Sequence, residues 1–377
     1  MDEPSLRDFL HNATRAPHPV PPPDPRVRAF HRSMPGYARS PVADAPGTAA
    51  QLGLARLVVK LETERFGLPA FKLLGASWAV CRALSARAGR DEPPATFGEL
   101  RALAAQLGDL TLVAATDGNH GRAVAHMARL LGLRSRVLVP RHTARARIDA
   151  IAGEGAEVDV VDGSYDDAIA ASAALADERR LVISDHSWPG YEQVPAWVAD
   201  GYQTIFDELA EQLDPIAPLV AIQIGVGALA SAAVRALAAP GRVIVGVEPV
   251  DGACALEAVR RGAVTPVPGP QQSIMAGLNC GTASPIALPA MAGGIAAFCA
   301  IDDRAAERAV RLLHGDGLDC GETGAAGVAG LLALRERWPD GTWERLGLAV
   351  GADPPAALAI CTEAPTDPAS FARITAG

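Results

Sequence analysis

Short apolar stretches alternate with longer, helix-compatible segments from residue 54 onward, and this alternation limits the folds that the chain can adopt. The apolar stretches have the length and composition of buried strands and cover residues 55–62, 110–116, 134–140, 158–163, 180–185, 220–227 and 242–248. Between them the sequence predicts helices over 75–88, 121–131, 141–156, 167–179, 198–213 and 228–238. Strands joined by such helices pair in parallel, so we expect an α/β protein with mostly parallel sheets.

The length of 377 residues is enough for two or three domains. The short, regular strand–helix units between residues 108 and 206 predict a compact small domain. Residues 1–107 and 207–377 would then form a large domain from both ends of the chain.

The charge of the chain argues against several classes of partner. Its net charge is −9 and no basic stripe interleaves with aromatic residues, so we expect no nucleic-acid partner. The N-terminal stretch lacks the basic start and apolar run of a signal peptide. Gly225 and Gly227 interrupt the apolar stretch 219–239, which favours a strand, a turn and a helix over a membrane span. A cytoplasmic protein with no membrane partner is predicted.

Cysteine and histidine spacing gives no sign of a metal or redox motif. The six cysteines, at 81, 254, 280, 299, 320 and 361, include no CxxC pair. The histidines are scattered without ligand spacing. We therefore expect buried, reduced thiols and no bound metal.

A glycine loop follows the predicted strand at 220–227. Gly225 and Gly227 precede a helix that opens at about Ala228, and backbone N–H groups at a helix N-terminus favour an anion such as phosphate. The segment also reads as G-x-G-x-x-A, with Glu248 about 20 residues later, which is the pattern of a dinucleotide site. An NAD-dependent oxidoreductase is therefore an alternative, as is close strand–helix packing without a ligand.

A single lysine lies among apolar and small residues in the segment PAFKLLGASW. Lys72 is expected to be desolvated there, which lowers the pKa of an amine and favours its neutral form. A neutral amine can form a Schiff base with an aldehyde cofactor. The alternative is a lysine with a buried stem and an ammonium that reaches water.

A polar loop, DGNHG, follows the predicted strand at 110–116. Such loops at the carboxyl ends of strands are where α/β sheets bind ligands, and Gly118 permits close approach of the backbone. The alternative is a plain turn in which Asp117 or Asn119 caps the next helix. We assign His120 no catalytic role.

The order of these three loops resembles the fold-type II pyridoxal-phosphate (PLP) enzymes, which include serine and threonine dehydratases and cysteine synthase. Within that group the chain is similar to the diaminopropionate ammonia-lyase family. The matching segments cover most of the chain; they are FHRSMPGYARSP, FGLPAFKLLGASWAV, AATDGNHGRAVAHMARLLG, SDHSWPGYEQVPAWVADGY, QIGVGALASA, SIMAGLNCGTASP, GLDCGETGAAGVAG and ICTEAPTDPASF. The resemblance implies a tryptophan-synthase-β-like fold with two open, twisted sheets, and a homodimer.

The resemblance also implies how the cofactor would be held. Lys72 would be the Schiff-base lysine, with Phe71 beside it, and Asn119 would hydrogen-bond the 3-hydroxyl of the pyridine ring. Cys361 or Thr362 would meet the pyridine nitrogen, and a neutral partner there suits β-elimination. The phosphate would lie on the backbone of Gly225, Val226, Gly227, Ala228 and Leu229.

For catalysis, the resemblance implies that Asp117 and Asp185 lie near the substrate Cα. Lys72 would remove the proton on one face of Cα and Asp117 on the other, and Asp185 or the Lys72 ammonium would protonate the leaving β-amino group. Two carboxylates suit a substrate that carries an extra ammonium. The expected product is pyruvate with ammonia. Residues implied to contact the substrate are Ser77, Thr116, Asp117, Gly118 and His120.

Some positions depart from the family pattern, and they bear on the substrate more than on the cofactor. Ala364 stands where glycine is usual, and Thr282 where a more polar residue is common. Elimination or replacement on another β-substituted amino acid, such as serine or threonine, therefore stays open. So does a binding protein that keeps the fold without catalysis. Cys254 and Cys280 align with a pair that forms a disulfide in some relatives.

Overall fold

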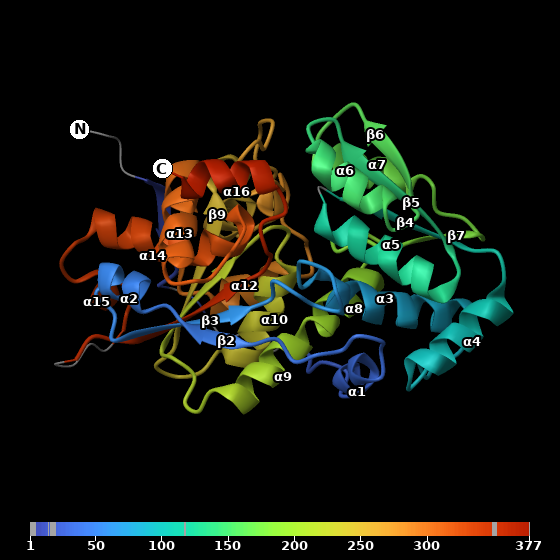
Figure 1. The fold of residues 1–377 in the computed structure, drawn as a ribbon, viewed down its shortest axis with the longest axis horizontal. Helices are drawn as coiled ribbons and strands as arrows, with labels where there is room; N and C mark the ends of the chain where they lie inside the picture. Colours follow the sequence, from blue (N-terminus) through green and yellow to red (C-terminus); the bar gives the residue numbers. More distant parts are fainter. Residues whose placement is uncertain (1–4, 14, 16–19, 117, 349–352, 377) are drawn as a thin grey trace.

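The strands of a computed structural model form two separate sheets (Figure 1). The structure describes residues 5–13, 15, 20–116, 118–348 and 353–376. In spatial order the larger sheet contains β1 (Leu6–His11), β10 (Ala297–Ile301), β9 (Val243–Pro249), β8 (Leu219–Gln223), β11 (Ala356–Cys361), β3 (Arg56–Leu61) and β2 (Val42–Asp44). The smaller sheet contains β6 (Glu157–Val161), β5 (Arg134–Pro140), β4 (Thr111–Ala115) and β7 (Arg180–Val182).

Parallel pairing dominates both sheets. Every strand pair that the structure describes in the smaller sheet is parallel. In the larger sheet only the edge strands β1 and β2 pair antiparallel. The prediction of an α/β fold with mostly parallel sheets is therefore confirmed.

Helices surround the two sheets (Figure 1). Their bounds are α1 (Val27–Arg32), α2 (Pro46–Leu52), α3 (Lys72–Arg87), α4 (Phe97–Leu107), α5 (Asn119–Leu131), α6 (Arg145–Ala152), α7 (Tyr165–Ala173), α8 (Gln193–Gly201), α9 (Gln203–Gln212), α10 (Ala228–Leu237), α11 (Cys254–Arg261), α12 (Leu288–Gly294), α13 (Asp303–Gly315), α14 (Glu322–Arg337), α15 (Thr342–Arg345) and α16 (Pro368–Thr375). Short 3₁₀ turns span Val250–Gly252 and Ala276–Leu278. No helix in the described part of the chain is long and apolar enough to cross a membrane.

Several predicted helix ends were wrong. Helix α3 begins at Lys72 instead of residue 75, and the segment predicted as one helix over 198–213 is two helices, α8 and α9. Helix α7 begins where Ser164 forms a capping box with Asp167, and it ends at Ala173. The predicted stop of α5 at Gly132 is correct, because this residue adopts the left-handed conformation there.

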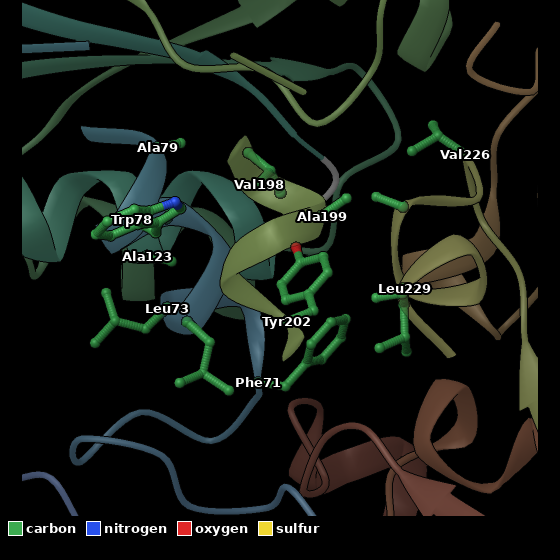
Figure 2. Packing of buried hydrophobic residues seen from close by; sticks show 14 of the residues in the cluster. Phe71, Leu73, Trp78, Ala79, Ala123, Val198, Ala199, Tyr202, Val226 and Leu229 are labelled. Atoms are coloured by element: carbon green, nitrogen blue, oxygen red, sulfur yellow. The ribbon is translucent and has the colours of Figure 1, made fainter. Parts of the chain in front are cut away.

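Helix α3 is packed between the parts of the chain that carry the two sheets. It contacts α8 on one side and α5 on the other. A Cβ added to Gly201 would lie 2.3 Å from the Leu74 carbonyl oxygen, so only glycine permits this approach of α8. Figure 2 shows Phe71 and Tyr202 together beside the glycine loop, and their ring centroids are 4.7 Å apart. This packing fixes the start of α3, where Lys72 lies.

The domain boundaries remain a proposal. All strands of the smaller sheet fall within residues 108–206. Helix α8 also falls in that range, yet it packs against α3 and α10 of the proposed large domain. We therefore keep 108–206 as the small domain, with α8 as its contact to the rest of the chain.

The structure corrects the expectation that every cysteine is a reduced thiol. Cys320 and Cys361 are joined by a disulfide, and their Cα atoms are 5.9 Å apart. Cys254 and Cys280 are buried and are not joined to each other. The disulfide ties the end of β11 to the segment that precedes α14.

A cluster of four charged side chains, fully removed from solvent, links β3 to α9. The Lys60 ammonium lies 2.8 Å from Glu208, and the Arg65 guanidinium lies 2.9 Å from Glu208 and 2.6 Å from Glu62. Burial alone would raise the pKa of Glu208, but Arg65 and Lys60 lower it to about 2. Glu208 is thus the acceptor that both cations share.

A Glu208→Gln substitution should destabilise the protein by roughly 3–5 kcal/mol, because it leaves the charges of Lys60 and Arg65 without their shared buried partner. Chemical denaturation measures this loss. Because folding depresses the Glu208 pKa, the contribution of this carboxylate should be complete above the ordinary glutamate pKa of 4.5 and lost as pH falls toward 2. Glu211→Gln on the same helix is the control, since its bridge to Arg28 is exposed. Equal losses in both variants would contradict this account.

Candidate active site

One pocket collects residues that follow strands of both sheets. Including its open mouth, it has an empty volume of about 660 Å³. Segments after β4 and β7 supply one wall, and segments after β8 and β11 supply another, as expected for a ligand site at the carboxyl ends of parallel strands. The lining residues are Phe71, Lys72, Thr116, Asn119, His120, Tyr165, Asp185, Gln223, Gly225, Val226, Gly227, Ala228, Leu229, Gly277, Leu278, Cys280, Thr323, Thr362 and Glu363.

Lys72 faces a carboxylate across this pocket. Its Nζ lies 2.6 Å from Asp185 Oδ2, and the Tyr165 hydroxyl donates to Asp185 Oδ1 at 3.1 Å. Burial alone would raise the pKa of Asp185, but the charge of Lys72, the nearby His120 and these hydrogen bonds hold it well below its usual range. Asp185 is therefore an ionised, buried carboxylate that orients the lysine amine.

Lys72 also differs from the second lysine of the sequence. The chain contains two lysines, Lys60 and Lys72. Lys60 is buried and bonds Glu208, Gln212 and the Ser40 carbonyl. Lys72 is the lysine that lines the pocket, so an aldehyde ligand in this pocket has one lysine to react with.

The glycine loop connects β8 to α10 within the pocket wall. Gly227 has φ +104°, and a Cβ there would lie 2.8 Å from the Met291 side chain. A Cβ on Gly225 would lie 3.1 Å from the Gly277 carbonyl oxygen. The first N–H groups of α10 have no partner within the helix, so this loop offers donors to an anion.

Two polar contacts organise the opposite wall. The Gln223 amide donates to Thr362 Oγ1 at 2.7 Å, which leaves the Thr362 proton available to a ligand. The Asn119 amide donates to Glu363 Oε2 in a short hydrogen bond. Burial raises the pKa of Glu363. Asn119 and Thr362 both line the pocket.

Sequence reasoning missed several lining residues, among them Tyr165, Gln223, Thr323 and Glu363. Gln223 carried a signal, because it is a polar residue inside an apolar strand. Glu363 directly follows the predicted Thr362. Tyr165 and Thr323 reach the pocket from α7 and α14, far from the motif loops in sequence.

Two predicted site residues need correction. Ser77 does not line this pocket; it is buried in α3, where its hydroxyl donates to the Leu74 carbonyl at 3.2 Å. Cys361 cannot offer a thiol to a ligand because it is in the disulfide with Cys320. Of the two residues predicted to meet the pyridine nitrogen, Thr362 is therefore the one that lines the pocket and keeps its hydroxyl.

The remaining residues of the polar loop are placed as follows. Thr116 and His120 line the pocket, and Gly118 lies between lining residues without being one. His120 is buried and in contact with the Ile183 carbonyl at 2.8 Å, and burial lowers its pKa. Asp117 lies outside the described residues.

The structure disfavours the dinucleotide interpretation of the glycine loop. Glu248 is fully buried, and its carboxyl accepts hydrogen bonds from the Ala255 and Leu256 N–H groups at 2.7 and 2.8 Å. Burial raises its pKa to about 8. It caps α11 and is not exposed to a ribose. Among the described residues, no group of three or more His, Cys, Asp or Glu side chains could hold a metal ion.

Comparison with known proteins agrees with this geometry. A family model described as pyridoxal-phosphate dependent enzyme matches residues 34–344. The diaminopropionate ammonia-lyase of Salmonella typhimurium is 34% identical over 327 residues, 82% of this chain and 81% of the relative. That of Escherichia coli is 33% identical over 354 residues, 90% and 88% of the two chains.

A solved structure extends the match to nearly the whole chain. It is the diaminopropionate ammonia lyase from Escherichia coli in complex with an aminoacrylate-PLP azomethine reaction intermediate. The two chains superpose with a TM-score of 0.86 at 29% identity, covering 99% of this chain and 97% of the other. A second structure of that enzyme contains D-serine and has a TM-score of 0.85 at 28% identity.

Proposed function

Because this chain belongs to the pyridoxal-phosphate dependent enzymes, and within them to the diaminopropionate ammonia-lyases, we propose that it converts 2,3-diaminopropionate to pyruvate and ammonia with pyridoxal 5'-phosphate. The observation that carries this proposal is the Lys72–Asp185 pair. Of the two lysines in the chain, Lys72 lines the pocket, and its amine lies 2.6 Å from a buried carboxylate.

The described residues fit the cofactor. Lys72 would bind its aldehyde, the backbone of residues 225–229 its phosphate, Asn119 its 3-hydroxyl and Thr362 its ring nitrogen. A Cβ at Gly225 or Gly227 would press on Gly277 or Met291, so these glycines set the shape of the loop whose N–H groups would bind the phosphate. The Thr362 oxygen already accepts a hydrogen bond from Gln223, so its hydroxyl proton can be donated to the ring nitrogen. When bound, pyridoxal phosphate supplies a ring that stores the electron pair left at the substrate Cα.

The chain's own side chains would then move the protons. Lys72 takes the Cα proton on one face, and Asp117 is proposed for the other face. Asp185 stays ionised, because Lys72, His120 and Tyr165 hold its pKa well below the usual range despite burial. It therefore orients Lys72 and attracts the second ammonium of the substrate, and the Lys72 ammonium protonates the leaving amine.

The products formed from several amino acids test the proposal. Protein loaded with pyridoxal phosphate is incubated separately with D- and L-2,3-diaminopropionate, serine and threonine. Diaminopropionate should give pyruvate with two ammonia molecules, at a higher kcat/KM than serine. A preference for serine or threonine, with one ammonia for each keto acid, would favour the dehydratase alternative.

We also propose that the chain is a cytoplasmic homodimer. Light scattering of the purified protein in solution measures its molar mass and so tests the dimer.

A Gly227→Ala variant should bind pyridoxal phosphate about 5- to 100-fold more weakly. The left-handed backbone and the 2.8 Å approach to Met291 both oppose a Cβ there, and such strain costs about 1–3 kcal/mol. Titration of the apoprotein, followed by cofactor absorbance, measures the affinity. Gly241→Ala is the matched control, because Gly241 also has positive φ but meets nothing within 4 Å. Equal affinity in both variants would contradict a phosphate role for the loop.

A further inference from the structure

The backbone of Glu363 is held between two parts of the pocket. It forms a bridge with Ala70, just before the lysine segment, and its carbonyl accepts the Gly321 N–H at 3.0 Å. The next residue, Ala364, donates its N–H to the Pro69 carbonyl at 2.9 Å. These contacts leave the Glu363 side chain little freedom to leave the pocket wall.

The burial and hydrogen bonds of the Glu363 carboxyl indicate a role within the pocket. The residue is 1% exposed and lines the pocket. Its Oε2 accepts the Asn119 amide, and the Thr323 side chain is also within hydrogen-bonding reach of this carboxyl. A buried acid is costly for stability unless hydrogen bonds replace its water, and here both hydrogen-bonding side chains line the pocket. Its retention beside a ligand pocket points to a role in the site.

We propose that Glu363 is a positioning residue that holds the Asn119 side chain with its amide nitrogen toward the cofactor, so that Asn119 donates to the 3-hydroxyl. This inference rests on the proposed cofactor. The two ends of an asparagine amide have nearly the same shape but opposite hydrogen-bonding character. The Glu363 oxygen that accepts from Asn119 selects the orientation in which one N–H of the amide nitrogen faces Glu363, and the second N–H of the same nitrogen can then donate to the cofactor.

The orientation of Asn119 controls the charge of the cofactor. An N–H donor stabilises the ionised 3-hydroxyl, whereas an amide oxygen in the same place would repel it. The ionised and protonated hydroxyl forms of lysine-bound pyridoxal phosphate absorb at longer and shorter wavelengths. The absorption spectrum without substrate therefore reports which end of Asn119 faces the ring.

The test compares spectra and cofactor affinities of loaded variants. Glu363→Leu should shift absorbance from the longer- to the shorter-wavelength band and weaken cofactor binding roughly ten- to hundredfold, the effect of losing a charge-assisted hydrogen bond. Glu363→Gln keeps an acceptor oxygen and should restore much of the long-wavelength band. If the leucine variant does not fold, Glu363→Asp retracts the carboxylate by one methylene and should shift the spectrum in the same direction.

Two further variants separate positioning from a general structural effect. In an Asn119→Ala background, Glu363→Leu should change the spectrum no further, because its effect passes through Asn119. Glu322→Gln alters a neighbouring buried acid that accepts from Ser370 and should leave the spectrum unchanged. Two results would overturn the inference about Glu363 while leaving the proposed function intact. One is a wild-type spectrum in Glu363→Leu, and the other is a Glu363→Leu spectral shift that persists at full size in the Asn119→Ala background. A wild-type protein that binds no pyridoxal phosphate would overturn the proposed function with it.

Discussion

A Lys72→Ala variant is expected to lose the long-wavelength absorbance of the bound cofactor and to reduce kcat for ammonia release by at least roughly 10⁴-fold. Two functions disappear together, because the amine both attaches the cofactor and exchanges protons with the substrate. Removal of a proton-transfer group alone costs roughly 10²–10⁴ in rate. Absorbance and ammonia release, measured on the same loaded sample, check the expectation.

The second lysine makes this experiment easy to interpret. Lys60 is buried in its contacts with Glu208, Gln212 and Ser40, so it cannot replace Lys72. Borohydride reduction of the loaded wild type should therefore label the peptide that contains Lys72 and leave the peptide with Lys60 unlabelled. If a Lys72→Ala variant still released ammonia at a tenth of the wild-type rate, Lys72 could not be the residue that binds the cofactor and transfers the protons.

An Asp185→Asn variant should keep its bound cofactor but lower kcat by roughly 10²–10³-fold. The substitution preserves shape while removing the charge that faces the Lys72 amine at 2.6 Å and accepts from Tyr165. The lysine would then lack the partner that orients it, and the substrate ammonium would lose a counter-charge. Steady-state rates and the absorption spectrum, taken together, distinguish lost turnover from lost cofactor.

Asp200 provides the matched control for this substitution. It is a partly buried aspartate, paired with Arg235 at 2.7 Å and outside the residues that line the site. Asp200→Asn should retain nearly full turnover. If both asparagine variants lost turnover equally, the loss would reflect general damage instead of a role for Asp185. If Asp185→Asn kept the wild-type rate, Asp185 would neither orient Lys72 nor attract the substrate ammonium in a way that limits turnover.

The local features of this site were predictable because short sequence segments determine them. Gly225 and Gly227 stand between a buried strand and a helix, and the structure has that strand, turn and helix. Lys72 stands in an apolar segment before a helix, and the structure puts it at the helix start. In each case neighbouring residues fix the backbone, so the pattern carries the information.

Other features depend on partners that are distant in sequence. Glu363 reaches Asn119 across 244 positions, and Gln223 reaches Thr362 across 139. Nothing in the sequence around either residue reveals such a contact. The pairing of Cys361 with Cys320 was likewise invisible, because it depends on how α14 packs beside β11.

The error at Ser77 has a simple geometric origin. With α3 beginning at Lys72, Ser77 lies five residues along the helix, or about 140° around its axis. It therefore faces away from the lysine and into the packed core.

The visible absorption spectrum of the purified protein, before and after addition of D,L-2,3-diaminopropionate, tests the central claim most directly. We predict a long-wavelength band from cofactor bound to Lys72, a change in that band on addition, and the appearance of pyruvate and ammonia. A band that does not respond would contradict diaminopropionate as the substrate. A colourless protein that pyridoxal phosphate cannot reconstitute would contradict the whole account.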